Sequence, residues 1–395
     1  MPADCLRVTP TSNLDYPFGV QFQLRRLRRL ALFGAVVVAQ FGVFEAGLRL
    51  WGSSEAAPSF QGLFMPDPDV GFRLKPGARI HFATAEFKTD IAINNAGVRD
   101  DEDLGPKPPD ERRIVFLGDS LVLSVQVPQR QAFPELLERR LNQRPSSSSY
   151  RVLNAGVQGY GPVQELLWFR KFGAGLEPDV VVVTVFVGND AEDAYASRLV
   201  LNPEQQSRGD KLRETLTLNL RRTVRQSMVL QIVRARANAV SAHFQPRATA
   251  APPYQSYARN PLPWVEDGFA IAVDCVRQIA AHAETLGART VVVLMPARFQ
   301  LVDADYERMR LAVANARGEL VRDAATDRFA AGLNQLGLPV LDLLPALRSA
   351  GPGSDLFFQQ NVHLTPRGHE TVAAALETFL ERHGLPDPAI RDQGR

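Results

Sequence analysis

The stretch Ile114-Val115-Phe116-Leu117-Gly118-Asp119-Ser120-Leu121 decides which fold the sequence predicts. A short apolar run of this kind is typical of a buried strand, and the glycine ends it. Because ligands of an open α/β sheet bind at the carboxyl ends of its strands, Ser120 becomes a candidate nucleophile. Taken alone, Gly-Asp-Ser is also typical of a strand-to-helix turn in which Asp119 or Ser120 only binds backbone amides.

Three later segments also lie where a predicted strand meets a loop, and they supply the groups that a serine nucleophile needs. They are Asn154-Ala155-Gly156-Val157-Gln158-Gly159-Tyr160-Gly161, Gly188-Asn189-Asp190 and His363-Leu364-Thr365-Pro366. The imidazole of His363 can act as the base, because a hydroxyl is a poor nucleophile until its proton is removed. The main-chain amides of Ser120 and Gly156 and the side-chain amide of Asn189 can donate to an oxyanion. This chemistry requires no metal.

The order of these four segments resembles that of the SGNH or GDSL hydrolase family, which is named for the serine, glycine, asparagine and histidine of its four blocks. The resemblance covers about residues 113–383. It implies catalytic roles for Ser120 and His363, an oxyanion hole formed by Ser120, Gly156 and Asn189, and no cofactor. It also implies a flavodoxin-like three-layer α/β/α sandwich around a mainly parallel five-stranded sheet.

The residues just before the histidine depart from the family pattern, which usually has an aspartate two or three positions earlier. Here these positions hold Asn361 and Gln360, and neither is a carboxylate. We expect Asn361 to orient the imidazole, with Gln360 as the second candidate and Asp355 as a substitute if its loop folds back. An asparagine can fix the ring tautomer, but it carries no charge and should lower the rate. We expect Asp119 and Asp190 to support their loops through backbone hydrogen bonds.

An alternation of strand and helix patterns from residue 113 onward predicts the parallel sheet. The predicted strands are 113–117, 150–153, 180–186, 290–295 and 340–343, which are short, apolar and rich in valine. The predicted helices are 133–142, 163–172, 264–286 and 306–336, and a last helix follows Thr365, a suitable N-cap. We expect this domain to span residues 113–385 and a tail to occupy residues 386–395.

The N-terminal part of the sequence predicts a membrane anchor. Four arginines precede an apolar run that extends from Leu30 to Phe44; they are Arg25, Arg26, Arg28 and Arg29. That run is shorter than the about 20 residues that a span needs, but a segment from residue 27 to residue 51 is long enough. The positive-inside rule then keeps residues 1–26 in the cytoplasm and places the catalytic domain in the periplasm or outside the cell. A cleaved signal peptide and a buried helix are the alternatives.

Residues 52–112 predict a small β-rich extension and a linker between the anchor and the domain. Short alternating segments at 79–83 and 89–94 are typical of strands. The extension contains Asn94-Asn95-Ala96-Gly97-Val98-Arg99, and a similar Asn-x-x-Gly-x-Arg segment is common in membrane-anchored relatives of the family. We expect its role to be structural.

Residues 195–262 interrupt the alternation of strands and helices. Apolar residues recur there every four positions, which predicts an amphipathic helix with a strongly basic opposite surface. A solvated helix face is the simplest interpretation. The alternatives are that the insertion leans over the site, or that it contacts anionic lipid or an acidic glycan.

Composition adds few constraints. The chain has 395 residues, of which 45% are hydrophobic and 22% charged, as in ordinary globular proteins, and its net charge of +2 indicates no class of partner. Nucleic-acid binding has little support, because the basic residues are not interleaved with aromatic ones. The leading hypothesis is therefore a membrane-anchored serine esterase that acts on an acylated small molecule or polysaccharide, with O-acetyl carbohydrate esters favoured. Acyl transfer to an exopolysaccharide and a non-catalytic glycan-binding or assembly role are the alternatives, and the oligomeric state is not predicted.

Overall fold

A computed structural model describes residues 60, 62–201, 255–314 and 319–385, together with five helical positions, which are Val36, Ala39, Gln40, Gly42 and Val43. The chain divides into two compact units, one made of residues 1–57 and 211–245 and the other of residues 58–210 and 246–395. All described residues except the five isolated ones belong to the second unit. The architecture below is that of the second unit alone.

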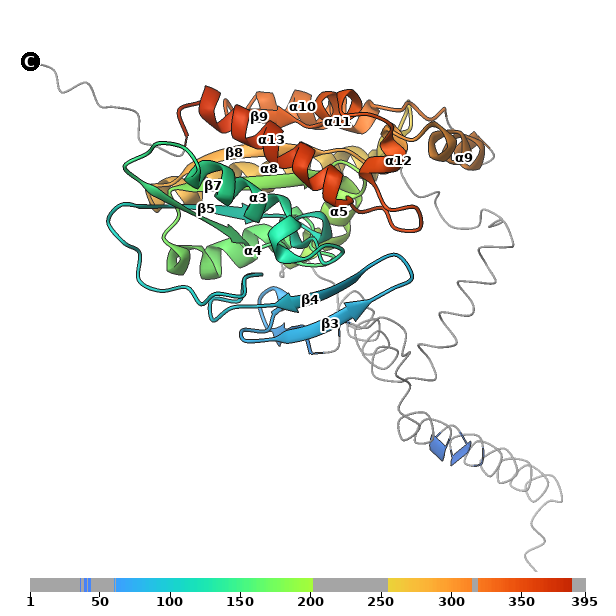
Figure 1. Ribbon diagram of the computed structural model, residues 1–395. Coiled ribbons are helices and arrows are strands. Elements are labelled where there is room, and N and C mark those ends of the chain that lie inside the picture. The colour runs from blue at the N-terminus through green and yellow to red at the C-terminus, as the bar shows by residue number, and fades with distance from the viewer. Residues whose placement is uncertain are drawn as a thin grey trace, which may run out of the picture. The chain divides into compact units, whose positions relative to one another are not determined.

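A five-stranded parallel sheet forms the centre of this unit (Figure 1). Its strands are β5 (Glu111–Leu117), β6 (Ser149–Asn154), β7 (Val180–Phe186), β8 (Arg289–Met295) and β9 (Val340–Asp342). They lie in the order β6-β5-β7-β8-β9, and every neighbouring pair is parallel. This is the flavodoxin-like order, in which the chain changes direction across the sheet between β5 and β7, and ligands of such sheets bind beyond the carboxyl ends of the strands at this switch point.

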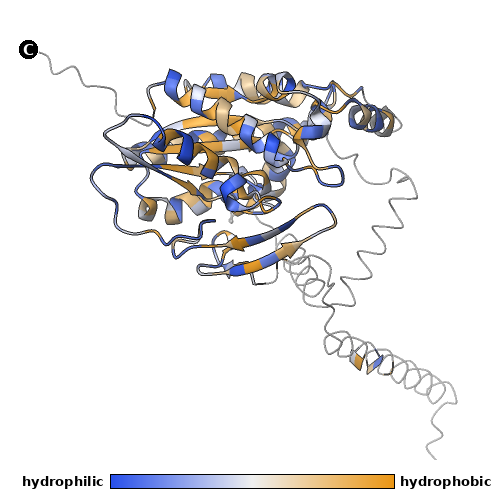
Figure 2. Cartoon of the chain, in the orientation of Figure 1, coloured by the Kyte–Doolittle hydropathy of each residue, from blue (hydrophilic) through white to orange (hydrophobic). Residues whose placement is uncertain are grey.

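Helices cover both faces of the sheet. Alternate residues of each central strand point to opposite sides, so apolar side chains on both faces are buried against helices. Ile114 and Phe116 of β5 pack in one core with α3 (Phe133–Asn142), α11 (Leu344–Ser349) and α13 (Pro366–Arg382). Val115 and Leu117 of the same strand pack in the other core, with α4 (Pro162–Phe172), α8 (Pro263–Thr285) and α10 (Ala324–Asn334). Figure 2 shows the strands as hydrophobic between helices of mixed character. The predicted three-layer α/β/α sandwich with a five-stranded parallel sheet is confirmed.

The segment before β5 forms two antiparallel hairpins, β1 (Phe64–Asp67) with β2 (Gly71–Leu74) and β3 (Arg79–Ala83) with β4 (Lys88–Ala92). Buried side chains of these hairpins, among them Leu74, Phe82 and Ile91, belong to the same core as α4. The hairpins are therefore packed onto the α/β sandwich and share its core. A bridge between Arg99 and Asn154 connects the following loop to the end of β6.

Most element bounds lie within two residues of those expected, but the single helix predicted for residues 306–336 is wrong. The structure has two helices there, α9 (Asp303–Ala314) and α10. Between them the main chain pairs with residues near the end of the insertion: the main-chain nitrogen of Arg259 donates to the carbonyl of Glu319, and that of Val321 donates to the carbonyl of Tyr257. This pairing over long sequence separation replaces helical hydrogen bonds that the local pattern favours. The remaining helices are α2 (Ser120–Leu123), α5 (Asp190–Leu201) and α12 (Gly353–Leu356).

Several predicted features lie outside the described residues. They are the cytoplasmic segment 1–26, nearly all of the anchor at 27–51, the basic amphipathic helix within the insertion and the tail at 386–395. Among the residues that the structure describes, no helix has both the length and the apolar character to cross a bilayer. The anchor therefore stays a prediction.

Candidate active site

Ser120 lies at the switch point of the sheet, directly after β5. Gly118 adopts a φ of +159°, and a Cβ there would overlap Cγ2 of Val122, so the turn requires glycine. Asp119 caps α2, because its Oδ1 accepts a hydrogen bond of 2.8 Å from the main-chain nitrogen of Leu121. The sharp turn thus places Ser120 as the first residue of a short helix at the carboxyl end of the strand.

His363 reaches Ser120 from the far end of the chain. It lies in the loop before α13, whose first turn is capped by Thr365 as expected. Its Nε2 is 2.8 Å from Oγ of Ser120, a hydrogen bond between residues 243 positions apart. Oγ also lies 3.5 Å from Oδ2 of Asp119, which is a much weaker contact. The hydroxyl proton therefore has its best acceptor on the imidazole.

Asn361 fixes the tautomer of this imidazole. Its Oδ1 accepts a hydrogen bond of 3.1 Å from the main-chain nitrogen of His363 and also contacts ring Nδ1. A main-chain N–H can only donate, so the atom that faces both nitrogens is the carboxamide oxygen, and Nδ1 must carry the ring proton. Nε2 is then left with a lone pair that points at Ser120. Within the described chain, the structure places Asn361 in the position that a triad aspartate usually fills.

The other two candidates for that position point elsewhere. Gln360 contributes its main-chain nitrogen, which donates to both carboxylate oxygens of Glu86 at 2.9 and 3.0 Å, and its side chain is exposed. Asp355 pairs with Arg367 at 3.1 Å. The loop therefore does not fold back in the way that would let Asp355 orient the ring.

The electrostatic result is an imidazole without a negative partner. Burial lowers the pKa of His363 to about 4, because the protonated ring would lose hydration and gain no carboxylate in return. The ring is therefore neutral at pH 7 and can accept a proton. The same burial makes the imidazolium that forms during catalysis less stable than in a triad with aspartate.

Two of the predicted oxyanion donors already have acceptors within the protein. The main-chain nitrogen of Gly156 donates to Oδ1 of Asn154 at 3.1 Å. A Cβ on Gly156 would overlap the main-chain nitrogen of Leu123 and lie 2.7 Å from Cβ of Val122, so this loop packs directly against α2. Asn189 donates from Nδ2 to Oδ2 of Asp193 at 2.7 Å, which uses one of its two N–H groups.

Asp190 supports the loop after β7, as its Oδ2 accepts a hydrogen bond of 2.8 Å from the main-chain nitrogen of Phe186. It belongs to a set of interacting acidic side chains, which also includes the buried Asp119 and Glu165 and the half-buried Asp193. Burial raises the pKa of Asp119 to about 6 and that of Asp193 to about 7. Burial and mutual repulsion raise the pKa values of Glu165 and Asp190 well above their ordinary range.

Sequence reasoning missed several residues that hold the site. Asp193 follows Asn189 by four positions on α5, a spacing that puts both side chains on one helix face and could have indicated their contact. Glu86 and Arg298 hold the loop of His363 from two sides. Arg298 donates from Nη1 to the carbonyl of Gln359 at 2.8 Å and pairs with Asp305 at 3.1 Å. Among the described residues, no group of three or more His, Cys, Asp or Glu side chains is placed to hold a metal ion.

One family model matches a part of the chain that contributes to this site. Residues 262–393, which include Asn361 and His363, match the family model described as the SGNH hydrolase-like domain of acetyltransferase AlgX. A search of curated protein sequences gave no match. Among solved structures, the chain is similar to TesA, with 15% identity over 69% of this chain and 99% of that chain and a TM-score of 0.39. The acetyl xylan esterase AlAXEase has 11% identity over 67% of this chain and 98% of that chain, with a TM-score of 0.39.

A third similar structure is Axe2, an acetylxylan esterase from Geobacillus stearothermophilus, with 11% identity over 68% of this chain and 93% of that chain and a TM-score of 0.38. Because these sequence identities and TM-scores are low, the solved structures carry no argument about function, which rests on the family model and on the site. The predicted resemblance is confirmed, since residues 262–393 match an SGNH hydrolase-like domain.

Proposed function

We propose that this protein is a serine-dependent esterase that removes an O-acyl group, with acetyl favoured, from a carbohydrate. The observation that carries the proposal is the continuous contact from Oγ of Ser120 through the imidazole of His363 to Oδ1 of Asn361. A hydroxyl, a neutral imidazole and an acceptor that fixes the ring tautomer are the parts of a serine nucleophile.

In the proposed reaction, Nε2 of His363 takes the proton of Ser120 while Oγ attacks the ester carbonyl. The oxyanion of the tetrahedral intermediate accepts hydrogen bonds from the main-chain amide of Ser120, from that of Gly156, which it shares with Oδ1 of Asn154, and from the second N–H of Asn189. His363 then gives its proton to the departing sugar hydroxyl, and the acyl group stays on Ser120. Water attacks this acyl-serine with His363 again acting as base, which releases the carboxylic acid and restores the hydroxyl.

The test compares hydrolysis of p-nitrophenyl acetate by the wild-type protein and by Ser120→Ala. We expect the variant to lose at least about three orders of magnitude in kcat, since removal of a triad nucleophile has effects of this size. Equal rates for the two proteins would contradict the proposal and favour a non-catalytic glycan-binding role.

Acyl transfer is the second candidate, and the match of residues 262–393 to the AlgX acetyltransferase model supports it. The same acyl-serine serves both reactions, and only the acceptor differs, a sugar hydroxyl in place of water. Measuring released acetate against acetyl groups transferred to an added polysaccharide separates them. A transferase is expected to show faster loss of donor when the acceptor glycan is present.

We also propose that the protein is anchored by residues 27–51 and acts on the outer side of the cytoplasmic membrane. The arginines ahead of the apolar run Leu30–Phe44 support this orientation. Two separate assays test this proposal. Alkaline carbonate extraction of membranes tests the anchor, and protease treatment of intact spheroplasts tests the orientation. Retention in the membrane with digestion of the catalytic domain is the expected result, and release into the soluble fraction would contradict the anchor.

A further inference from the structure

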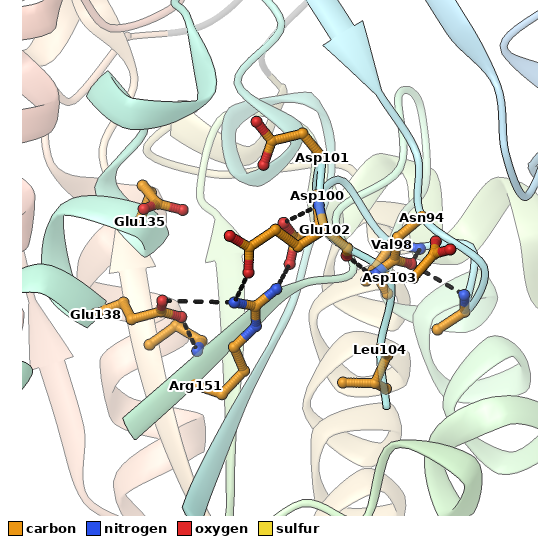
Figure 3. Close-up of polar contacts among 12 residues, drawn as sticks. Asn94, Val98, Asp100, Asp101, Glu102, Asp103, Leu104, Glu135, Glu138 and Arg151 are labelled. Atoms are coloured by element: carbon orange, nitrogen blue, oxygen red, sulfur yellow. Dashed lines mark hydrogen bonds and ion pairs between the residues drawn. The ribbon is translucent and has the colours of Figure 1, made fainter. Parts of the chain in front are cut away.

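The segment Asn94–Arg99 precedes the α/β sandwich, and the proposed reaction does not use it. Its turn is closed by Asn94, whose Oδ1 accepts hydrogen bonds from the main-chain nitrogens of Ala96 at 3.0 Å and Val98 at 3.3 Å. Nδ2 of the same side chain donates to the carbonyl of Glu102 at 3.2 Å. Figure 3 shows Asn94 with the acidic stretch that follows it. This network determines the direction in which the chain delivers Arg99.

Arg99 is almost completely buried, with 3% of its surface exposed. Its Nη1 donates to the carbonyls of Leu123 at 2.7 Å and Ser124 at 2.5 Å, and its Nη2 donates to that of Val127 at 2.7 Å. Burial lowers the pKa of Arg99 only to about 10, so the guanidinium stays charged at neutral pH. The buried guanidinium thus donates hydrogen bonds to three main-chain carbonyl oxygens. All three belong to residues that come shortly after Ser120 in the chain.

Leu123 is the last residue of α2, the helix that begins at Ser120, and Ser124 and Val127 lie in the turn that follows it. A helix of four residues has almost no internal hydrogen bonds, and its last carbonyls have no partner inside the helix. The next residue, Ser124, adopts the left-handed conformation with a φ of 57°, which is unfavourable for a residue other than glycine. External donors are therefore needed to keep this turn in place, and a cation at a helix C-terminus is favourable.

The same residue also reaches the loop of Gly156. The main-chain nitrogen of Arg99 donates to the carbonyl of Asn154 at 2.9 Å. The side chain of Asn154 in turn donates to the carbonyl of Val122 at 2.8 Å and accepts from the main-chain nitrogen of Gly156. Arg99 therefore connects the helix that carries the nucleophile to the loop that carries a proposed oxyanion donor.

The residue next to Arg99 ties this connection to the central sheet. Oδ2 of Asp100 pairs with Nη2 of Arg151 on β6 at 2.6 Å, a contact drawn in Figure 3, and its Oδ1 accepts from Nε2 of Gln129 at 3.0 Å. Arg151 also pairs with Glu102 at 2.9 Å. The position of the guanidinium is thus determined from both sides, by the turn at Asn94 and by the edge strand of the sheet.

We propose that Arg99 is a positioning residue of the active site, which keeps Oγ of Ser120 in line with His363 and with the amide of Gly156. This inference rests on the proposed function, because it assigns Arg99 a role in that reaction. Arg99 does not touch the reacting atoms. It acts through the carbonyls at the end of α2.

The test uses the full-length protein and the variants Arg99→Gln and Arg99→Lys. The readouts are the second-order rate constant for phosphonylation of Ser120 by a fluorophosphonate, kcat and KM for p-nitrophenyl acetate, and the midpoint of thermal unfolding. A matched control is Arg113→Gln. Arg113 is equally buried and donates to the carbonyls of Gly105 at 2.9 Å and Leu176 at 3.2 Å, near the opposite end of β5.

We expect R99Q, measured well below its unfolding midpoint, to lower kcat and the phosphonylation rate by about 10- to 100-fold, since displacement of a nucleophile by about 1 Å has effects of this size. KM should change little, and R99K should recover part of the rate, because an ammonium still donates to carbonyls but lacks the planar fork. R113Q should lower the unfolding midpoint and leave the rates of the folded protein unchanged.

The inference is overturned if folded R99Q reacts at the wild-type rate, or if R99Q and R113Q lower the rates equally. If neither Arg99 variant folds, the variant Thr89→Val tests the inference instead. Oγ1 of Thr89 donates to the carbonyl of Val125 at 2.6 Å, in the turn after α2 that Arg99 also binds. A lowered phosphonylation rate in T89V supports the inference and an unchanged rate overturns it. A wild-type protein that is never labelled at Ser120 contradicts the proposed function itself, and the inference with it.

Discussion

Oδ1 of Asn361 accepts hydrogen bonds from both the main-chain nitrogen and the ring Nδ1 of His363. This pair gives the site the geometry of a serine triad without its negative charge. Asn361 orients the imidazole ring as a triad aspartate would, but it carries no negative charge that could stabilise the imidazolium. The consequences can be measured, because they affect the pH dependence as well as the rate.

Replacing Asn361 by aspartate should raise the pKa of His363 from its value of about 4 in the native protein. A carboxylate beside an imidazole raises the pKa by about 1 to 3 units. His363 acts as base only when neutral, so activity is lost as the pH falls through its pKa, and N361D should move this acid limb of kcat/KM to higher pH. We expect kcat at neutral pH to increase by about tenfold or more, since the charge stabilises the imidazolium.

The matched control for N361D is Gln360→Asp, which adds the same charge one residue away on an exposed side chain. Its acid limb should stay close to that of the wild type, because solvent screens the added charge. Equal shifts in both variants, or no shift in N361D, would show that the contact between Asn361 and the ring does not set the pKa.

Removal of the carboxamide in Asn189→Ala should lower kcat by about 10²-fold and leave KM nearly unchanged, because an oxyanion donor acts mainly in the transition state. Asp193→Asn should have a smaller effect, since it keeps Asn189 and replaces only the acceptor of one N–H. Steady-state kinetics with p-nitrophenyl acetate provide the comparison. An N189A rate within twofold of the wild type would remove Asn189 from the oxyanion hole.

Gly156→Ala should destabilise the protein by about 1 to 3 kcal/mol, because the added methyl group overlaps the backbone of α2. The displaced helix should also lower kcat in the fraction that stays folded. Denaturant titration measures the first effect and activity at low denaturant the second. Gly105→Ala is the control, as a Cβ there meets nothing within 4 Å, and a similar loss in both variants would contradict the packing argument.

The buried carboxyl group of Glu165 should make the stability of the protein depend on pH. Its native pKa is raised well above the ordinary value by burial and by the charge of Asp119. In the unfolded chain it ionises at about pH 4.3, so the native state loses stability relative to the unfolded state as the pH rises from there toward the native pKa. Glu165→Gln lacks this loss of stability, so its advantage over the wild type should grow as the pH rises above about 4.3.

Denaturant titrations of E165Q and the wild type at several pH values test this expectation. Glu307→Gln is the control, because the side chain of Glu307 is 54% exposed on α9. A stability difference between E165Q and the wild type that stays constant with pH would mean that Glu165 is already charged in the native state.

The sequence was sufficient for the central sheet and for the contact between Ser120 and His363. The strands are short, mostly apolar runs, and parallel strands bring their carboxyl ends to one edge whatever the length of chain between them. The sequence left Asn361, Gln360 and Asp355 open as partners of the ring. Only the path of the loop decides among them, and Glu86 and Arg298 determine that path from elements far away in the chain.

Other features could not be predicted from the sequence, because tertiary contacts determine them. The pattern at residues 306–336 is helical, yet pairing with Tyr257 and Arg259 breaks it into two helices. Glu165 looks like an ordinary polar position of a helix, and only the packing of α4 shows that it is buried. The segment ending in Arg99 was recognisable by its pattern, but the three carbonyls that Arg99 binds could not be identified without the fold.

The most direct test of the central claim is to locate the residue that an organophosphate modifies. We predict that diethyl p-nitrophenyl phosphate inactivates the protein, that peptide mass spectrometry finds a single diethylphosphoryl group on Ser120, and that His363→Ala reacts far more slowly. An active protein that takes no such group, or a group on another residue that persists in Ser120→Ala, would contradict the account.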